Sequence, residues 1–208
     1  MTKIVVQSNA SGTGTFTIAA PNSSNTQTLT LPDETGSVLT DQSNLAGVTG
    51  VGKVLQVVQT VKSDSFSSAT KGSYIAVTGL SVTITPTSAS SKVLVTAHVT
   101  AGNQNNIVCM FHIYRDGAKI TPDGVSTGLT PSDAYALFAG GVAGNTGVSM
   151  TLPFQFLDSP NTTSSTTYQI YAAVNSTAVL NLNVNPTLAN GGGVPGGNSS
   201  ITVMEIAG

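Results

Sequence analysis

Nine carboxylates are the side chains of this sequence best suited to acid–base chemistry. They are Asp33, Glu34, Asp41, Asp64, Asp116, Asp123, Asp133, Asp158 and Glu205. A glycan-cleaving enzyme needs two carboxyl groups that flank the scissile bond. No motif pairs two of them in this way, because Asp33 and Glu34 are adjacent and point apart in an extended segment. We interpret all nine as turn or solvated residues and expect no catalytic site.

His98 and His112 are the two histidines, and Cys109 is the single cysteine. A nucleophile–base pair would need one of the histidines, but neither has a partner at a metal-binding spacing. Each is most simply a residue on a strand. A threefold metal or anion site is the alternative, if three copies bring either histidine to one axis. Cys109 lies in an apolar run and is interpreted as a buried hydrophobic residue. We expect neither a metal nor a cofactor.

The composition of the chain excludes several classes of partner. Charged residues make up 8% of the 208 residues, against roughly 25% in an ordinary soluble domain. The net charge is −2 and the seven basic residues are scattered, whereas nucleic-acid binding needs clustered cations. No stretch approaches the length of a membrane span, and the apolar run after Lys3 is too short for a signal peptide. We therefore expect synthesis in the cytoplasm and no membrane insertion.

Strands must position these side chains, because apolar residues alternate with polar ones along most of the sequence. The alternating or apolar segments are 54–61, 74–77, 80–84, 92–99, 107–114, 148–156, 168–174, 179–184 and 201–206. Many short strands separated by turn signals indicate a sandwich or barrel. We predict an all-β fold, with an antiparallel jelly-roll β-sandwich over 54–208.

Three local patterns give sharper expectations. The Asp116-Gly117 pair predicts a hairpin, because both central residues of such a turn need positive φ. Residues 132–139 are compatible with one helical turn. Segments 54–61 and 107–114 are apolar on both faces, so we expect a second contact surface on each, supplied by other copies of the chain.

The first 46 residues have shorter alternating segments and fewer apolar residues than the rest of the chain. Short alternating strands at 15–18 and 28–31 carry too few apolar residues for a core of their own. They need another surface to pack on. The Gly-rich stretch 47–53 is interpreted as a linker to the larger domain.

Two stretches carry a resemblance to phage tail-fibre proteins. Residues 14–18 (GTFTI) followed by 28–39 (TLTLPDETGSVL) resemble a module found near the N-terminus of many such fibres. The patterns at 79–86 (GLSVTITP), 91–95, 111–117 (FHIYRDG) and 201–206 (ITVMEI) resemble a fibre head domain that is similar to tumour necrosis factor-like trimeric jelly rolls. The chain lacks the long repetitive shaft of such fibres, so the resemblance implies a short fibre.

The resemblance implies a homotrimeric structural protein of a bacteriophage particle. Residues 1–46 would anchor it to other tail or baseplate proteins, with Phe16, Ile18, Leu29 and Leu31 as the candidate anchoring residues. The head, 54–208, would recognise a glycan or protein on the host surface. Its candidate contacts are Tyr135, Phe138, Asn190 and Asn198, which lie in the longest polar connections. The alternatives are a capsid decoration or baseplate protein that binds only virion proteins, and a glycan-degrading enzyme.

Overall fold

The structure is a computed structural model that describes Ser11 and residues 53–103, 108–124, 134–139, 148–175, 179–184 and 196–208. The chain divides into two units, Met1–Gly47 and Val48–Gly208, and all described residues except Ser11 belong to the second. All the secondary-structure elements in the described ranges are β-strands, and no helix occurs there. The strands are β1 (Val54–Lys62), β2 (Phe66–Ser68), β3 (Ile75–Ile84), β4 (Lys92–Asn103), β5 (Val108–Arg115), β6 (Ala118–Lys119), β7 (Ala136–Ala139), β8 (Val148–Asp158), β9 (Thr166–Val174), β10 (Leu180–Leu182) and β11 (Ser199–Ile206).

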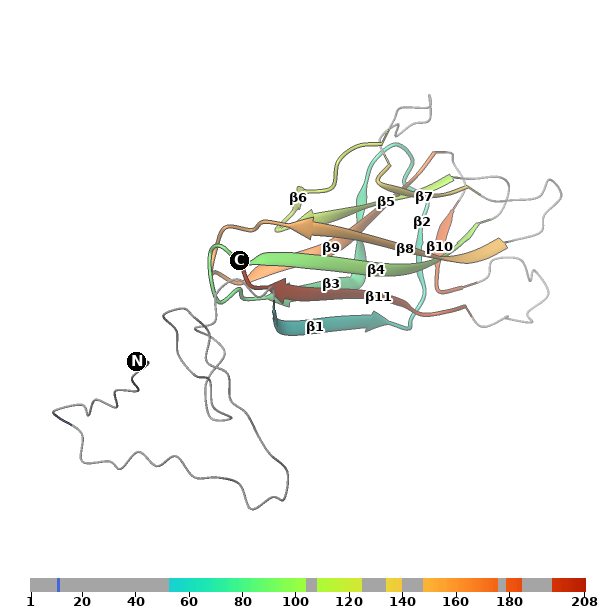
Figure 1. Cartoon of the computed structure of the whole chain (residues 1–208). Coiled ribbons are helices and arrows are strands. Elements are labelled where there is room, and N and C mark those ends of the chain that lie inside the picture. The colour runs from blue at the N-terminus through green and yellow to red at the C-terminus, as the bar shows by residue number, and fades with distance from the viewer. Residues whose placement is uncertain are drawn as a thin grey trace, which may run out of the picture. The chain divides into compact units, whose positions relative to one another are not determined.

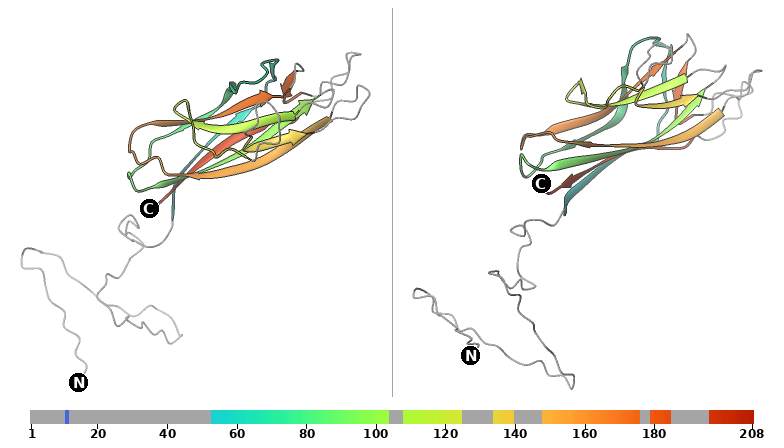
Figure 2. Two further views of the ribbon diagram at one scale, coloured as in Figure 1. Left: turned by 90° about the horizontal axis from the view of Figure 1, so that it is seen from above. Right: turned by 45° about the horizontal axis from the view of Figure 1, so that its top comes forward.

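The strands form two antiparallel sheets that lie face to face (Figures 1 and 2). Sheet A has the order β1-β11-β4-β8, and the short β10 and β2 continue it beside the end of β4. Sheet B has the order β3-β9-β5, and β6 and β7 pair with successive parts of β5. When the short β2, β6 and β10 are left out and the other strands are renumbered along the chain, the orders are 1-8-3-6 and 2-7-4-5. This is a jelly roll, so the predicted sandwich is confirmed.

The hydrophobic core lies between the two sheets and follows from the period-two alternation of the sequence. In β11, Ile201 and Val203 point inward and are fully buried, whereas their neighbours are half-buried. Phe111 from β5 and Tyr168 from β9 are the largest fully buried side chains facing them. Burying one large apolar side chain contributes about 1.5–3 kcal/mol, so this layer is the main source of the stability of the sandwich.

Two of the local predictions fall in sheet B, and one of them is confirmed while the other is wrong. The Asp116-Gly117 hairpin between β5 and β6 is confirmed, with φ of 49° and 81°. The helical turn predicted over 132–139 is wrong where the structure describes it, because Ala136–Ala139 is strand β7. It pairs with Val108–Phe111 of β5. The backbone N–H and C=O groups along this edge of β5 are buried and need hydrogen-bond partners. A strand at 136–139 supplies these partners, whereas a helical turn would not.

The two ends of the sandwich differ in what they carry. Val54, where the chain enters β1, lies opposite Ile206, near the end of the chain. We call this the entry end. At the opposite end Asn103 lies across from Val148, and Lys62 lies across from Ser199. We call this the loop end, because the connections 104–107, 140–147 and 185–195 join strands there.

Candidate functional site

The predicted contact residue Tyr135 lies beside the edge strand β8. Its ring meets Phe154 and Phe156 edge-on, with centroid distances of 6.4 and 6.0 Å. Its hydroxyl donates to the Gln155 carbonyl at 2.5 Å. Phe154 and Phe156 are partly buried against the core, so Tyr135 packs the segment before β7 onto the sandwich. A host contact through this half-buried ring stays a prediction.

The structure places the other predicted contacts unequally. Asn198 is exposed at the loop end, and its carbonyl accepts a hydrogen bond from the Thr100 hydroxyl at 2.9 Å. Phe138 belongs to β7 and pairs with Cys109 through the backbone, but its side chain lies outside the described part. Asn190 also lies outside the described residues. So do the four candidate anchoring residues, which are Phe16, Ile18, Leu29 and Leu31.

The two histidines have opposite environments. His112 is fully buried, and its Nδ1 lies 2.7 Å from the Thr121 hydroxyl. The Tyr74 ring meets it edge-on at 4.7 Å. A copy-to-copy site at His112 is therefore wrong, because its ring is enclosed by its own chain. His98 is exposed on the outer side of β4, where a threefold site stays a prediction. Among the described residues, no three His, Cys, Asp or Glu side chains cluster as metal ligands.

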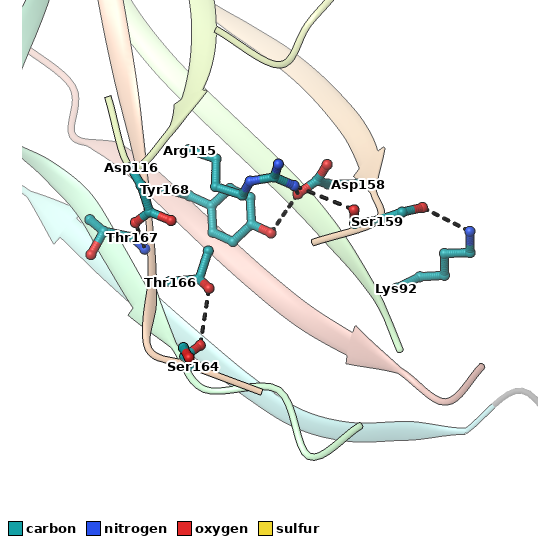
Figure 3. Close-up of polar contacts among 9 residues, drawn as sticks. All are labelled: Lys92, Arg115, Asp116, Asp158, Ser159, Ser164, Thr166, Thr167 and Tyr168. Atoms are coloured by element: carbon teal, nitrogen blue, oxygen red, sulfur yellow. Dashed lines mark hydrogen bonds and ion pairs between the residues drawn. The ribbon is translucent and has the colours of Figure 1, made fainter. Parts of the chain in front are cut away.

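The interpretation of every carboxylate as a turn or solvated residue is wrong for Asp158 and Glu205, which are both buried. Asp158 ends β8 in sheet A. Its Oδ2 accepts hydrogen bonds from the Arg115 guanidinium and from the Tyr168 hydroxyl, each at 2.7 Å (Figure 3). Both donors belong to sheet B. These three side chains therefore pin one sheet to the other at the entry end.

The electrostatics of this pin follow from its burial. Burial raises the pKa of the Tyr168 hydroxyl, and the hydrogen bond to Asp158 raises it further. Burial alone would lower the pKa of Arg115, but the hydrogen bond and charge of Asp158 outweigh this, so the pKa is raised. Asp116 sits nearby at the hairpin and accepts from the Thr167 backbone N–H at 2.8 Å (Figure 3). Each of these polar groups has a partner within the chain, so we interpret the arrangement as a clamp that holds the two sheets together and not as a binding site.

Glu205 is a buried carboxylate held by neutral donors. Its Oε1 accepts from both the backbone N–H and the hydroxyl of Thr87 at 2.7 Å, and its Oε2 accepts from the Gln56 amide at 2.6 Å. Burial would raise the pKa of Glu205, but the hydrogen bonds from Gln56 and Thr87 outweigh this and lower it. A β-bulge between Val54 and Gln56 sets the register that places Gln56 opposite Glu205.

A third polar cluster lies at the loop end. The buried Lys62 ammonium donates to Asp64 at 2.8 Å, and this hydrogen bond lowers the pKa of Asp64. The Asn183 amide donates to the backbone carbonyls of Lys62 and Asp64 at 2.9 and 3.0 Å. Ser199 donates to Asn183 at 2.7 Å and accepts from the Thr100 backbone N–H at 3.0 Å. This cluster fixes the strand ends from which the long connections emerge.

In sheet B, the outer face of β5 is covered by side chains of the same chain, because Met110 and His112 are buried there. His112 lies beneath Tyr74 and Thr121, as described above. Tyr114 and Tyr171 stack on each other with ring centroids 3.8 Å apart and planes at 16°. The prediction that copies of the chain cover the second face of 107–114 is therefore wrong, because the chain covers it itself.

The outer face of sheet A is different, since large apolar side chains are exposed on it. Val57 is 55% exposed on β1 and Leu157 is 54% exposed on β8. Val61 on β1 is equally open, at 55%. The sequence prediction of a second contact surface on 54–61 thus corresponds to a face with exposed apolar side chains among the described residues, and its cover by other copies stays a prediction.

Cys109 gives a direct test of core burial. Its side chain is fully buried on the inner side of β5, as predicted, and burial raises the pKa of its thiol to about 12. Since the thiolate is the reactive form, we expect no reaction with Ellman's reagent at pH 8 in the native protein. One thiol per chain should react after unfolding in guanidinium chloride. Rapid labelling of the native protein would contradict this packing.

The comparisons with known proteins give little beyond the fold. No family model matches the chain, and no curated protein matches it. A chain of the T13 IBDV viral particle aligns over 73% of this chain and 37% of its own length, with 14% identity and a TM-score of 0.34. A chain of infectious bursal disease virus, Gx strain, aligns over 73% and 40%, with 13% identity and a TM-score of 0.33. This chain thus spans well under half the length of either, and a likeness this weak contributes nothing to the function proposed below.

Proposed function

We propose that the chain is a structural protein of a virus particle, and more specifically a short tail-fibre subunit of a bacteriophage. Residues 1–46 would attach it to tail or baseplate proteins. Residues 54–208 would form a homotrimeric head that contacts a glycan or protein on the host surface. The observation that carries this proposal is the polarity of the sandwich between its entry end and its loop end.

The polarity suits an attachment protein in two ways. The segment that resembles a particle-joining module precedes Val54, so it reaches the sandwich at the entry end. The connections 104–107, 140–147 and 185–195, of which the last two are the longer, join strands at the opposite end. Binding residues are commonly carried by loops on a rigid scaffold. A head attached at one end would therefore present these connections outward at the other.

A weak contact at each loop end would be sufficient for attachment. Three copies in one head, and several heads in one particle, would bind together. Linking binding sites raises the effective concentration of each, and avidity can exceed single-site affinity by roughly 10²–10⁴-fold.

The purified full-length chain is the first object to test. We expect light scattering to give about three times the 20.9 kDa chain mass, and labelled trimer to bind host cells and block adsorption of the phage. We expect host polysaccharide incubated with it to yield no new reducing ends. A monomer at micromolar concentration would overturn the trimer, and labelling of the capsid or baseplate in intact particles without cell binding would replace the fibre by the decoration or baseplate role.

A further inference from the structure

We infer that the outer face of sheet A is the surface through which copies of this chain associate. This inference deepens the proposed homotrimer by naming the face that forms it. The occupant is a second copy, with the sheets of neighbouring protomers packed against each other. Three observations support this assignment: an in-register apolar row, the absence of Asp, Glu, Lys and Arg from that row and from the next two rows toward the loop end, and the cover over β5 in sheet B.

An unbroken apolar row crosses all four main strands of sheet A. The strand register places Val57 opposite Met204, Met204 opposite Leu94, and Leu94 opposite Leu157. The two outer members, Val57 and Leu157, are more than half exposed, and the two central ones are half-buried. Isolated exposed apolar residues are ordinary on a protein surface. Four aligned across a flat sheet form a continuous patch, which marks an interaction site.

The two rows that follow the apolar row toward the loop end carry no charged side chain, whereas the row on the entry side contains the exposed Lys92 opposite Ile206. The next row contains Gln59, Thr202, Thr96 and Gln155, and the one after it contains Val61, Ser200, His98 and Pro153. Across these three rows there is no carboxylate, lysine or arginine. Interface cores are depleted in charged side chains. Side chains near a threefold axis meet their own copies, so a surface without charge is well suited to association with other copies.

Other occupants fit this face less well. Sugar recognition uses aromatic rings, and none of the three rows contains Phe, Tyr or Trp. The outer face of sheet B is a poor alternative for self-association. Its β5 strand is covered by the same chain, and the β5–β6 hairpin beside it carries exposed charges at Asp116 and Lys119.

The face is large enough to contribute substantially to an interface. Strands lie about 4.8 Å apart and rise about 3.4 Å per residue, so four strands over seven residues span roughly 19 by 24 Å. This gives several hundred Å², the same order as the ~800 Å² that each partner contributes to a standard interface. A ring of three copies closes by using two parts of such a surface on each protomer.

The test compares two variants that add the same charge to the full-length chain. Leu157→Glu places a carboxylate in the apolar row, and Thr163→Glu places one on an exposed turn at the entry end. We expect Leu157→Glu to raise the trimer dissociation constant by roughly 100-fold or more, because the buried charge would lack a partner. Thr163→Glu should leave it within about 2-fold. Val57→Asp, at the other end of the row, should repeat the effect, and circular dichroism should show that each variant is folded.

A labelling experiment locates the face independently. Thr202→Cys puts a thiol at the centre of the face, and the buried Cys109 stays silent. Maleimide should label this thiol at least 10-fold more slowly in the trimer than in the Leu157→Glu background. If the wild type is trimeric but Leu157→Glu stays trimeric and Thr202→Cys labels fast, the face is wrong and the trimer stands. If the wild type is monomeric and Thr202→Cys is protected only in intact particles, another virion protein occupies the face, and the inference fails.

Discussion

Replacing Asp158 with alanine is expected to lower the free energy of unfolding by about 3 kcal/mol. The variant removes the acceptor shared by the Arg115 guanidinium and the Tyr168 hydroxyl, each at 2.7 Å. Breaking a buried ion pair by removing one partner costs about 3–5 kcal/mol. The lower end applies, because 30% of the Arg115 side chain is exposed and can be hydrated. Urea unfolding followed by circular dichroism, at one fixed protomer concentration, would measure the loss.

Two matched variants separate this clamp from a general effect at the entry end. Tyr168→Phe keeps the fully buried ring and deletes one hydroxyl, so we expect a loss of about 1–2 kcal/mol. Lys92→Ala removes an exposed side chain that donates only to the Ser159 hydroxyl, and should change stability by less than about 0.5 kcal/mol. Equal effects of Asp158→Ala and Lys92→Ala would show that Asp158 does not hold the two sheets together.

The architecture could be predicted from the sequence because side chains in a strand alternate between faces. That rule locates β4, β8, β9 and β11 and their inward residues from the pattern alone. The Asp116-Gly117 turn was equally accessible, since few residue pairs adopt positive φ at both positions. What failed was β7, because its four residues acquire their conformation from the free edge of β5 rather than from their own pattern.

The burial of Asp158 and Glu205 was not predicted from the sequence. The alternation in β11 that points Ile201 and Val203 inward also points Glu205 inward. The inward position of Glu205 could therefore have been predicted from the strand pattern. Its partners did not follow from the pattern, because Gln56 and Thr87 are more than 100 residues away along the chain. Likewise, which of two doubly apolar strands keeps an open face depends on the cover that Tyr74 and Thr121 give to β5. Such cover is a property of tertiary packing.

Replacing Glu205 with alanine is expected to cost about 3–5 kcal/mol of stability. The carboxylate accepts from the Gln56 amide and from the Thr87 backbone N–H and hydroxyl. Alanine would remove the acceptor of both Thr87 donors and of one Gln56 amide N–H, while the Gln56 amide would keep its hydrogen bond to the Thr85 carbonyl. Each group left unsatisfied costs about 1–3 kcal/mol. Thr163→Ala, at an exposed position of the same end of the sandwich, is the matched control and should lose less than about 0.5 kcal/mol. Guanidinium unfolding at pH 7 would measure both.

Glu205→Gln should reveal the charge of this site through its pH dependence. Because folding lowers the pKa of Glu205 below its ordinary value of 4.5, the ionised carboxylate stabilises the fold fully above about pH 5. This contribution is lost as the pH falls below 4.5 and through the folded-state pKa. The wild type should therefore be more stable than Glu205→Gln at pH 7, and the difference should shrink as the pH falls toward 3. Parallel stability curves for the two proteins between pH 7 and 3 would mean that the donors of Gln56 and Thr87 hold a neutral group, and that the charge of Glu205 contributes nothing to the fold.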